Sequence, residues 1–242
     1  KYESLNFFQR TENISISIYP ELSVLLSTSG TTGSPKLVRL AYKNIQSNAE
    51  SIAEYLNIDA DERPITTLPI KYSYGLSIIN SHLLKGATIV LTEKTVFFRD
   101  FWNQFNEYKC TSFAGVPYTY TMLKRIGFDK IELPTLKYFT QAGGKLSEEF
   151  IKHFSEYALE KKVKFFVMYG QTEATARITY VPPKKLDDKI GSIGISIPYG
   201  EIKIMNDGTE VKNPNEVGEI VYSGDNVMLG YAENKDDLTK GD

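Results

Sequence analysis

The sequence is poor in the side chains that build disulfides and most metal sites. It has one cysteine, Cys110, and two histidines, His82 and His153, among 242 residues. A single cysteine excludes an internal disulfide and a metal site made of cysteines alone. We expect Cys110 to be a small buried hydrophobic residue. Neither histidine has an acidic or cysteine partner at motif spacing, so we expect both to have packing or surface roles.

Long apolar runs and an excess of one charge are also absent. The longest stretches without a charged residue are 22–35 and 110–123, whereas a membrane-spanning helix needs about 20 mostly apolar residues. Lys and Arg number 28 and Asp and Glu number 30, so the net charge is −2 at pH 7. This balance provides no basic surface of the kind that binds nucleic acid. We therefore expect no membrane span and no nucleic-acid partner.

The start of the sequence shows no signal-peptide pattern. The chain starts at Lys1 instead of methionine, and it stops at Lys240-Gly241-Asp242. The first residues lack the apolar segment of a secretory signal peptide. We expect a reducing, cytoplasmic setting, and we expect the sequence to be a piece of a longer protein.

Strand and helix patterns alternate over the first 180 residues. Short apolar runs predict a buried strand at 22–26 and further strands at 37–42, 65–68, 87–91, 111–115, 138–141 and 164–168. Five apolar residues between 45 and 56 fall on one face of a predicted helix. A second helix is predicted over 147–162, with Ser147 as its N-cap, glutamates in its first turn and lysines in its last. This alternation predicts an α/β fold with a parallel-rich sheet flanked by helices.

The composition of the sequence and its predicted secondary structure change after residue 180. Glycine and proline become frequent, and short strands are predicted at 201–205 and 219–222. We therefore expect a smaller β-rich lobe at the C-terminal end. The sequence divides into an α/β subdomain over 1–180 and a β-rich segment of the same large domain over 181–242.

A loop rich in glycine and hydroxyl groups follows the first predicted strand. It reads Thr28-Ser29-Gly30-Thr31-Thr32-Gly33-Ser34-Pro35-Lys36. Glycines let backbone N–H groups approach phosphate oxygens, and hydroxyls and an ammonium group add further donors. The loop is not a Walker A motif, because Leu37 follows the lysine where that motif has Ser or Thr. By composition alone, a phosphate-binding loop and a solvated turn explain this segment equally well.

A second polar cluster follows the strand predicted at 164–168. It reads Tyr169-Gly170-Gln171-Thr172-Glu173. Open α/β sheets bind ligands at the carboxyl ends of their strands. An aromatic ring there can stack on a base, a hydroxyl can contact a phosphate, and a carboxylate can hold Mg²⁺. Alone, the cluster is equally compatible with an ordinary turn between a strand and a helix.

Together, the two clusters resemble the adenylate-forming superfamily, which includes acyl-CoA synthetases, peptide-synthetase adenylation domains and luciferases. The loop 28–36 resembles its phosphate loop, and residues 169–173 resemble its aromatic-Gly-x-Thr-Glu motif. Further segments match in the same order, at 68–70 with 74–76, and at 114–117, 142–144, 191–194 and 218–231. So many ordered matches are improbable by chance. The fold that the resemblance implies is part of the large domain of such an enzyme.

The resemblance also implies a reaction that uses ATP and Mg²⁺. A small carboxylic acid attacks the α-phosphate of ATP, which gives an acyl-adenylate and pyrophosphate. The thiol of coenzyme A or of a phosphopantetheinyl carrier protein then takes the acyl group. The implied catalytic residues are Lys36, Thr172 and Glu173, with Glu173 as the metal ligand. The implied acid pocket contains Tyr72, Val116 and Gly143. The implied nucleotide-binding residues are Thr28, Ser29, Gly30, Thr31, Thr32, Gly33, Ser34, Lys36, Gly143, Gly144, Tyr169, Gly170 and Thr172.

Three departures from the family pattern affect the expected substrate and nucleotide contacts. Leu37-Val38 follows the loop lysine, where acyl-CoA synthetases usually have Gly-Val. Tyr72 stands where acyl-CoA synthetases usually have His and where amino-acid activators have an acid. An amino-acid substrate is therefore disfavoured. Val167, two residues before the motif tyrosine, removes one possible partner for adenine.

Parts of the family pattern are missing from the sequence. The N-terminal subdomain is largely absent, and so is the C-terminal lid domain with the catalytic lysine of the family. The Thr-Gly-Asp ribose motif is missing too, and Gly241-Asp242 comes too early after Tyr231 and lacks the threonine. We expect this chain alone to bind nucleotide weakly at most and to be inactive. The alternative is a non-catalytic nucleotide- or acyl-binding fragment or degenerate relative. A phosphotransferase is disfavoured by the absence of Walker geometry.

The sequence allows more than one role for several other residues. Arg177 either faces the nucleotide or pairs with Glu173 one helical turn away. The aromatic residues Phe113, Tyr118 and Tyr120 are expected in the core, and one of them could line an acyl pocket. Lys71 is expected to be a solvated surface residue.

Overall fold

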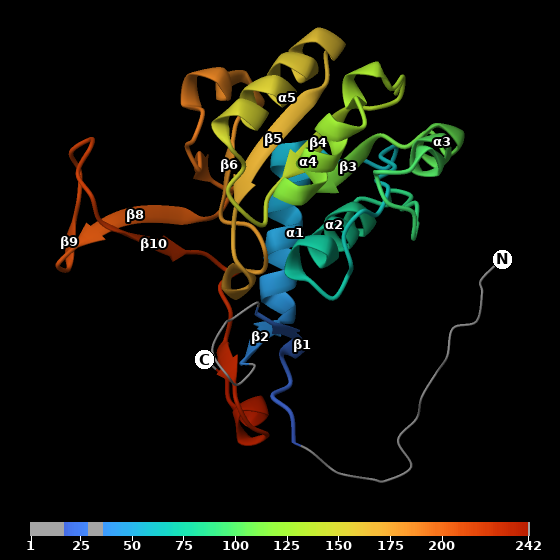
Figure 1. The fold of residues 1–242 in the computed structure, drawn as a ribbon. Helices are drawn as coiled ribbons and strands as arrows, with labels where there is room; N and C mark the ends of the chain where they lie inside the picture. Colours follow the sequence, from blue (N-terminus) through green and yellow to red (C-terminus); the bar gives the residue numbers. More distant parts are fainter. Residues whose placement is uncertain (1–16, 29–35, 242) are drawn as a thin grey trace, which may run out of the picture.

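The computed structural model describes residues 17–28 and 36–241, and its largest sheet has five strands in the order β3-β4-β5-β6-β7 (Figure 1). These strands are β3 (Ser112–Gly115), β4 (Tyr138–Gln141), β5 (Lys164–Tyr169), β6 (Thr179–Val181) and β7 (Ile195–Ser196). Strands β3, β4 and β5 are parallel, whereas β6 and β7 are antiparallel to their neighbours. The expected α/β fold is confirmed, with a sheet that is mixed and parallel at one side.

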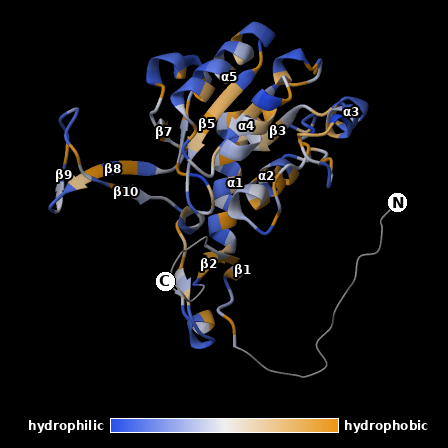
Figure 2. Cartoon of the chain, viewed as in Figure 1, coloured by the Kyte–Doolittle hydropathy of each residue, from blue (hydrophilic) through white to orange (hydrophobic). Residues whose placement is uncertain are grey.

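Helices cover both faces of this sheet. The helices are α1 (Tyr42–Leu56), α2 (Ser73–Leu84), α3 (Arg99–Glu107), α4 (Pro117–Arg125) and α5 (Glu148–Lys161). Successive strand residues point to opposite faces. Phe113, Phe139 and Phe165 accordingly pack against α3, α4 and α5, while their neighbours Ala114, Tyr138 and Phe166 pack against α1 and α2. Figure 2 shows the hydrophobic strand β5 beside helix α5, which is more hydrophilic.

Two smaller sheets complete the described chain. One contains β1 (Leu22–Ser27), β2 (Leu37–Ala41) and β11 (Gly230–Ala232), in the order β1-β2-β11. The other contains β8 (Glu201–Asn206), β9 (Thr209–Glu210) and β10 (Glu219–Ser223), and it projects from the body as an arm (Figure 1). The predicted division at residue 180 falls within β6, and it stays a prediction. The short 3₁₀ helices are η1 (Phe128–Lys130), η2 (Thr172–Ala174), η3 (Pro183–Lys185), η4 (Asp187–Lys189) and η5 (Asp236–Thr239).

Several predicted elements differ from the observed ones. The strands expected at 65–68 and 87–91 form only the isolated parallel bridges Pro64–Ser112 and Ile65–Val90. Pro64 and Pro69 bracket the first segment and supply no N–H groups, which limits pairing there. The strand expected at 22–26 was predicted to be buried, but β1 lies at the edge of its sheet and only Leu26 in it is buried. Tyr42 begins α1 instead of ending a strand.

Other expectations about local structure are confirmed. Helix α5 begins after Ser147, whose hydroxyl accepts a hydrogen bond from the backbone N–H of Phe150. Cys110 is fully buried in the core. Among the helices of residues 17–28 and 36–241, none combines the length and the hydropathy that crossing a bilayer requires.

The aromatic group on β3 and α4 is only partly a core group. Phe113 and Tyr120 are buried, but 70% of Tyr118 is exposed. Tyr118 and Tyr120 are two residues apart on a helix, so they point to nearly opposite sides and only one of them reaches the sheet. The expectation of a core position was therefore wrong for Tyr118, which is the one of the three that lines a cavity described below.

The two histidines have different surroundings. His153 on α5 is partly exposed, and its Nε2 lies 3.3 Å from Oδ1 of Asp129. His82 is buried between α2 and the sheet, where its Nδ1–H donates to the carbonyl of Ile78 (2.8 Å) and its Nε2 accepts from the hydroxyl of Tyr138 (2.9 Å). Burial lowers the pKa of His82 from 6.5 to about 4. This histidine therefore joins α2 to β4 as a neutral ring.

Acid should destabilise the fold through His82. The pKa of His82 is about 4 in the folded chain and 6.5 in the unfolded chain, where the ring is not buried. The unfolded chain therefore binds more protons as the pH falls from 6.5 to 4, and the folded state loses stability over that range. The whole difference corresponds to about 3 kcal/mol. We expect His82→Gln to flatten this part of the pH dependence, measured by urea unfolding at several pH values. His153→Gln is the control and should retain it. Equal slopes in wild type and His82→Gln would contradict this prediction.

Candidate functional site

The two ends of the predicted phosphate loop are held together by a strand pair. Ser27 at the end of β1 is paired with Leu37 at the start of β2. Thr28 directly follows Ser27, and Lys36 directly precedes Leu37. The first and last residues of the loop therefore lie at the same end of the β1–β2 strand pair. The predicted roles of Ser29, Gly30, Thr31, Thr32, Gly33 and Ser34 fall on residues outside the described ranges.

The predicted catalytic lysine is engaged by a carboxylate. Nζ of Lys36 lies 2.7 Å from Oε1 of Glu233, and both side chains are about half exposed. The same ammonium lies 5.7 Å from the centre of the Tyr231 ring. Strand β11 is antiparallel to β2, with Ala232 opposite Leu37, which places both partners beside the lysine.

Tyr231 connects the two sequence motifs. Its hydroxyl donates a hydrogen bond of 2.8 Å to Oε1 of Glu173, and this bond raises the pKa of the tyrosine. Because the Tyr231 ring also lies beside the ammonium of Lys36, one side chain reaches the last residue of each motif. The structure thus brings together Lys36 and Glu173, which the sequence places far apart.

The segment around Glu173 is fixed by hydrogen bonds from two directions. The backbone N–H of Met228 donates to the carbonyl of Glu173 (2.9 Å). The hydroxyl of Thr172 lies 3.2 Å from that of Ser73, the first residue of α2. Ser73 therefore joins the predicted phosphate-side residues, although the sequence offered no motif that pointed to it.

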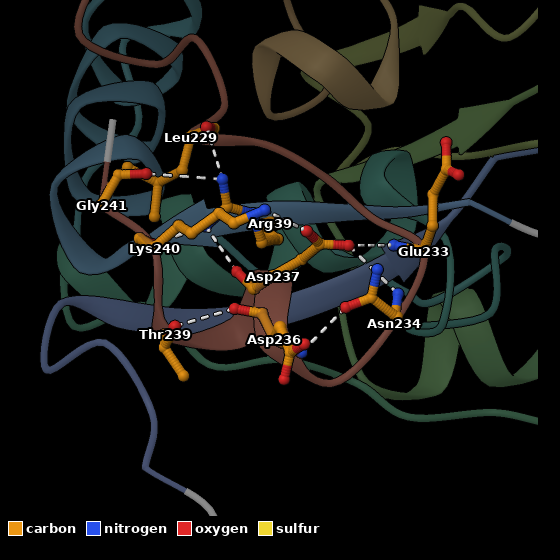
Figure 3. A network of polar contacts seen from close by, with 9 residues as sticks. All are labelled: Arg39, Leu229, Glu233, Asn234, Asp236, Asp237, Thr239, Lys240 and Gly241. Atoms are coloured by element: carbon orange, nitrogen blue, oxygen red, sulfur yellow. Dashed lines mark hydrogen bonds and ion pairs between the residues drawn. The ribbon is translucent and has the colours of Figure 1, made fainter.

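A buried arginine secures the turn that follows β11. The guanidinium of Arg39, in the middle of β2, donates to backbone carbonyls on both sides of this turn (Figure 3). The accepting carbonyls belong to Leu229, Asp237, Lys240 and Gly241. Arg39 stands in the apolar run 37–41, and a charge in such a run was the one sequence signal that could have identified it.

The carboxylate of Asp237 closes the same turn from within. It accepts from the backbone N–H groups of Glu233 (2.8 Å) and Asn234 (3.1 Å) and pairs with the ammonium of Lys240 at 2.7 Å (Figure 3). The hydrogen bond from Lys240 and those from the two backbone groups lower the pKa of Asp237 to about 2. The hydrogen bond from the backbone N–H of Glu233 to Asp237 therefore helps to hold Glu233 beside Lys36.

The glycine pair after β4 adopts backbone angles that favour glycine. Gly143 has φ 78° and Gly144 has φ 157°. A Cβ atom on Gly143 would lie 3.0 Å from Cγ1 of Val116. The side-chain amide of Gln141 donates to the carbonyl of Gly144 (2.8 Å) and fixes the turn. Gly143 and Val116, both predicted to border the acid pocket, are thus in contact.

A cavity of about 690 Å³ opens next to Val116. Its walls are mainly apolar and aromatic, with three charged residues among them. The lining consists of Thr66, Thr67, Leu68, Pro69, Thr92, Glu93, Lys94, Thr95, Val96, Phe97, Phe98, Val116, Tyr118, Thr119, Met122 and Arg125. Tyr72 is not part of this lining. It is 51% exposed and lies beneath the ammonium of the exposed Lys71, 5.2 Å from its ring centre.

Arg177 was expected either to face the nucleotide or to pair with Glu173, and its position in the structure fits neither expectation. Only 1% of the residue is exposed, and it forms no ion pair with Glu173. Residues 172–174 form a 3₁₀ helix that ends at Ala174, so the helical spacing that would bring Arg177 and Glu173 together is absent. The backbone of this segment packs on Gly170, where a Cβ atom would lie 1.8 Å from the carbonyl oxygen of Ala176. Tyr169, at the end of β5, is half-buried.

The chemistry of these side chains fits a nucleotide with magnesium. In residues 17–28 and 36–241, no three metal-ligating side chains converge. Magnesium bound with nucleotides typically takes one or two carboxylates, and its other ligands are phosphate oxygens and water. Glu173, facing Lys36 across Tyr231, is a carboxylate suited to that role.

Comparison with known proteins identifies the family. The family model described as AMP-binding enzyme matches residues 19–232. The chain belongs to the AMP-binding enzyme family. The match includes both motifs, the glycine pair and β11.

Two relatives are similar to the chain in sequence, and a solved structure is similar to it in fold. The 2-succinylbenzoate–CoA ligase of Bacillus subtilis is 31% identical over 227 residues, which are 92% of this chain and 45% of that protein. The oxalate–CoA ligase of Saccharomyces cerevisiae is 29% identical over 229 residues, which are 91% and 40%. A solved structure of the o-succinylbenzoate CoA synthetase of Bacillus subtilis with ATP and magnesium ion has a TM-score of 0.78 at 30% identity, covering 94% of this chain and 47% of that one. The chain thus spans less than half the length of these relatives.

Glu233→Gln should strengthen the binding of pyrophosphate by this chain. The substitution removes the carboxylate that engages Lys36. An exposed ion pair contributes about 0–1 kcal/mol, so we expect an increase of up to about fivefold, measured by calorimetry at low salt. Glu216→Gln is the control, since it removes the same charge from an exposed acid that contacts Asn213. An affinity equal to that of Glu216→Gln would refute a competition between Glu233 and phosphate.

Proposed function

We propose that the protein containing this chain activates a carboxylic acid with ATP and transfers the acyl group to a thiol. The first step forms an acyl-adenylate and releases pyrophosphate. The observation that carries this proposal is the contact of Tyr231 with both Lys36 and Glu173. A cation and a carboxylate at one edge are the groups needed to hold a triphosphate and its metal ion.

The proposed roles follow from charge and position. The loop from Thr28 to Lys36 holds the β- and γ-phosphates, and the hydroxyls of Thr172 and Ser73 contact the α-phosphate. Glu173 holds Mg²⁺, which when bound neutralises charge on the phosphates. Catalysis in such a site consists mainly of positioning the reactants and stabilising charge in the transition state.

The nucleoside would bind between the end of β5 and the turn after β4. In this proposal the ring of Tyr169 stacks on adenine, and Gly143 and Gly144 lie at the edge of the base. The contact between Gly170 and the backbone of Ala176 supports it, because this contact fixes the residue that follows Tyr169.

We assign the cavity of about 690 Å³ to the body of the acid. Val116 lines this cavity and touches Gly143, so the cavity adjoins the proposed adenylate site. The lining has one carboxylate, Glu93, against two cations, Lys94 and Arg125. A pocket of this composition suits an apolar acid better than one with a free amino group, because burying an unpaired ammonium is costly.

Coenzyme A is the acceptor that we propose first. The names of the relatives from Bacillus subtilis and Saccharomyces cerevisiae are those of CoA ligases. A phosphopantetheinyl carrier protein is the alternative acceptor, and transfer of the acyl group to such a protein but not to coenzyme A would select it.

A second candidate function is nucleotide or acyl binding without turnover. The ion pair between Lys36 and Glu233 favours the absence of turnover, because a carboxylate engages the lysine that the resemblance implies to be catalytic. Pyrophosphate release decides between the two candidates. We measure it on the longest natural form of the protein with a panel of carboxylic acids, and formation of ADP instead of AMP would point to a phosphotransferase.

Glu173→Gln should weaken Mg·ATP binding without disturbing the fold. The amide can still accept the hydrogen bond from Tyr231, but it loses the charge that attracts the metal ion. We expect a loss of about tenfold, or 1.4 kcal/mol, by calorimetry. The matched variant Glu216→Gln should bind like the wild type. Equal affinities of wild type and Glu173→Gln would remove Glu173 from the metal role.

The acid preference can be tested with pairs of compounds. We expect faster pyrophosphate release with a carboxylic acid than with the amino acid of the same side chain. The reason is that the cavity assigned to the acid has two cations, Lys94 and Arg125, against one carboxylate, Glu93, so the burial of an α-ammonium group there is poorly compensated. Faster release with the amino acid in several pairs would overturn this expectation.

A further inference from the structure

We infer that Arg177 is a positioning residue for the nucleotide site, an inference that rests on the proposed function. Arg177 is the largest of the fully buried side chains in the described ranges. None of the ion pairs found in those ranges involves it. A buried charge without an opposite charge is costly to fold, so its presence requires an explanation.

The guanidinium of Arg177 joins three elements of the fold. One Nη atom donates to the hydroxyl of Tyr55 on α1 (2.9 Å) and to the sulfur of Met168 on β5. The other donates to the hydroxyl of Ser77 on α2 (3.3 Å). The plane of the group lies over the ring of Tyr74, 4.5 Å from its centre. A fork of several donors can make these contacts together, whereas a single ammonium cannot.

Two of the residues that Arg177 contacts, Met168 and Tyr74, adjoin proposed nucleotide residues. Met168 precedes Tyr169, and a Cβ atom on Gly170 would lie 2.9 Å from Cα of Arg177. Tyr74 follows Ser73, whose hydroxyl meets Thr172. These contacts support the side of the site that we assign to adenine and the α-phosphate.

The same arginine supports the turn after β4 through Tyr74. Cδ1 of Tyr74 lies 4.0 Å from the position of a Cβ atom on Gly143. The hydroxyl of Tyr74 also forms a hydrogen bond of 2.8 Å with Thr140, near the end of β4. One buried side chain therefore lies beneath both segments that we assign to the nucleoside.

The backbone is strained where it turns Arg177 inward. Thr175 has φ 51° and Ala176 has φ 90°, and neither is a glycine. Three hydrogen bonds hold this conformation. The hydroxyl of Thr175 donates to the carbonyl of Asn226 (2.7 Å), and the amides of Asn226 (3.0 Å) and Asn48 (3.3 Å) donate to the carbonyl of Arg177. Strain of this kind persists only where the surroundings enforce it.

The neighbours of Arg177 do not need it for their own hydrogen bonds. The hydroxyl of Tyr55 also donates to the sulfur of Met168 (3.1 Å), and that of Ser77 donates to the carbonyl of Tyr74 (2.7 Å). Replacing the arginine with an apolar side chain of similar length would therefore leave no orphaned donor. Stability alone does not explain the arginine, and its placement beneath the nucleotide site does.

The test separates stability from nucleotide binding with Arg177→Met. Mg·ATP affinity and the thermal midpoint are measured for the wild type and the variant, in this chain and in the longest natural form. We expect an affinity at least about tenfold lower, since small displacements of positioned groups have effects of this size. The thermal midpoint should be unchanged or higher. An affinity within twofold of the wild type, or a loss of affinity that accompanies a lower midpoint, would overturn the inference.

Two further variants sharpen this test. Arg177→Lys keeps the charge but loses the several donors of the guanidinium group, so its Mg·ATP affinity should stay below that of the wild type. A wild-type affinity for Arg177→Lys would contradict the positioning role. Phe154→Leu opens a small gap in the core on the opposite face of the sheet, and it should lower the midpoint while leaving the affinity unchanged.

The outcomes distinguish this inference from the proposed function. If the wild type binds Mg·ATP, but releases no pyrophosphate with any acid, the proposed function fails and the affinity ratio still tests Arg177. If neither wild type nor variant binds Mg·ATP, both proposals fail.

Discussion

The antiparallel pairing of β11 with β2 determines where the charged groups of the candidate site lie. Strand β11 is only three residues long, yet it carries Tyr231 and precedes Glu233, which meet Glu173 and Lys36. So short a strand pair is weak by itself. The guanidinium of Arg39 reinforces it by binding carbonyls before and after the strand. The geometry of the site thus depends on a buried cation in β2 that touches none of the proposed ligands.

The larger sheet contributes in a different way. Its parallel strands β3, β4 and β5 end at one edge, and the segments after β4 and β5 carry Gly143, Gly144 and Tyr169. Open sheets of this kind offer their ligand sites at that edge. Helices on both faces keep the strands buried and hold them in place. The polar segments after β4 and β5 are not needed for this packing, so their side chains can contact a ligand.

The sequence predicts those elements whose signals are local. The apolar runs of β4 and β5 and the cap at Ser147 are visible within a few residues, and the structure has them at the predicted places. The runs at 65–68 and 87–91 are misleading, because the same apolar pattern can form a single bridge when prolines limit pairing. The motif residues were found through resemblance, since their spacing alone also suits ordinary turns.

The contacts that organise the site could not be predicted from local patterns. Tyr231 and Glu173, or Arg177 and Tyr55, are brought together only by the folded chain. Arg177 illustrates the limit, because helical spacing predicts a partner four residues away. The observed 3₁₀ helix removes that geometry and sends the side chain into the core. Tertiary packing decided its position against the local signal.

The pairing of Ser27 with Leu37 has a consequence for how such a loop can change over evolution. The ends of the loop are joined by the β1–β2 ladder, so the entropic cost of closing it is met by the sheet and not by a ligand. Doubling the length of a flexible loop adds only about 0.6 kcal/mol to that cost. Insertions and substitutions between Thr28 and Lys36 can therefore alter what the loop binds while the strands that carry it stay in register.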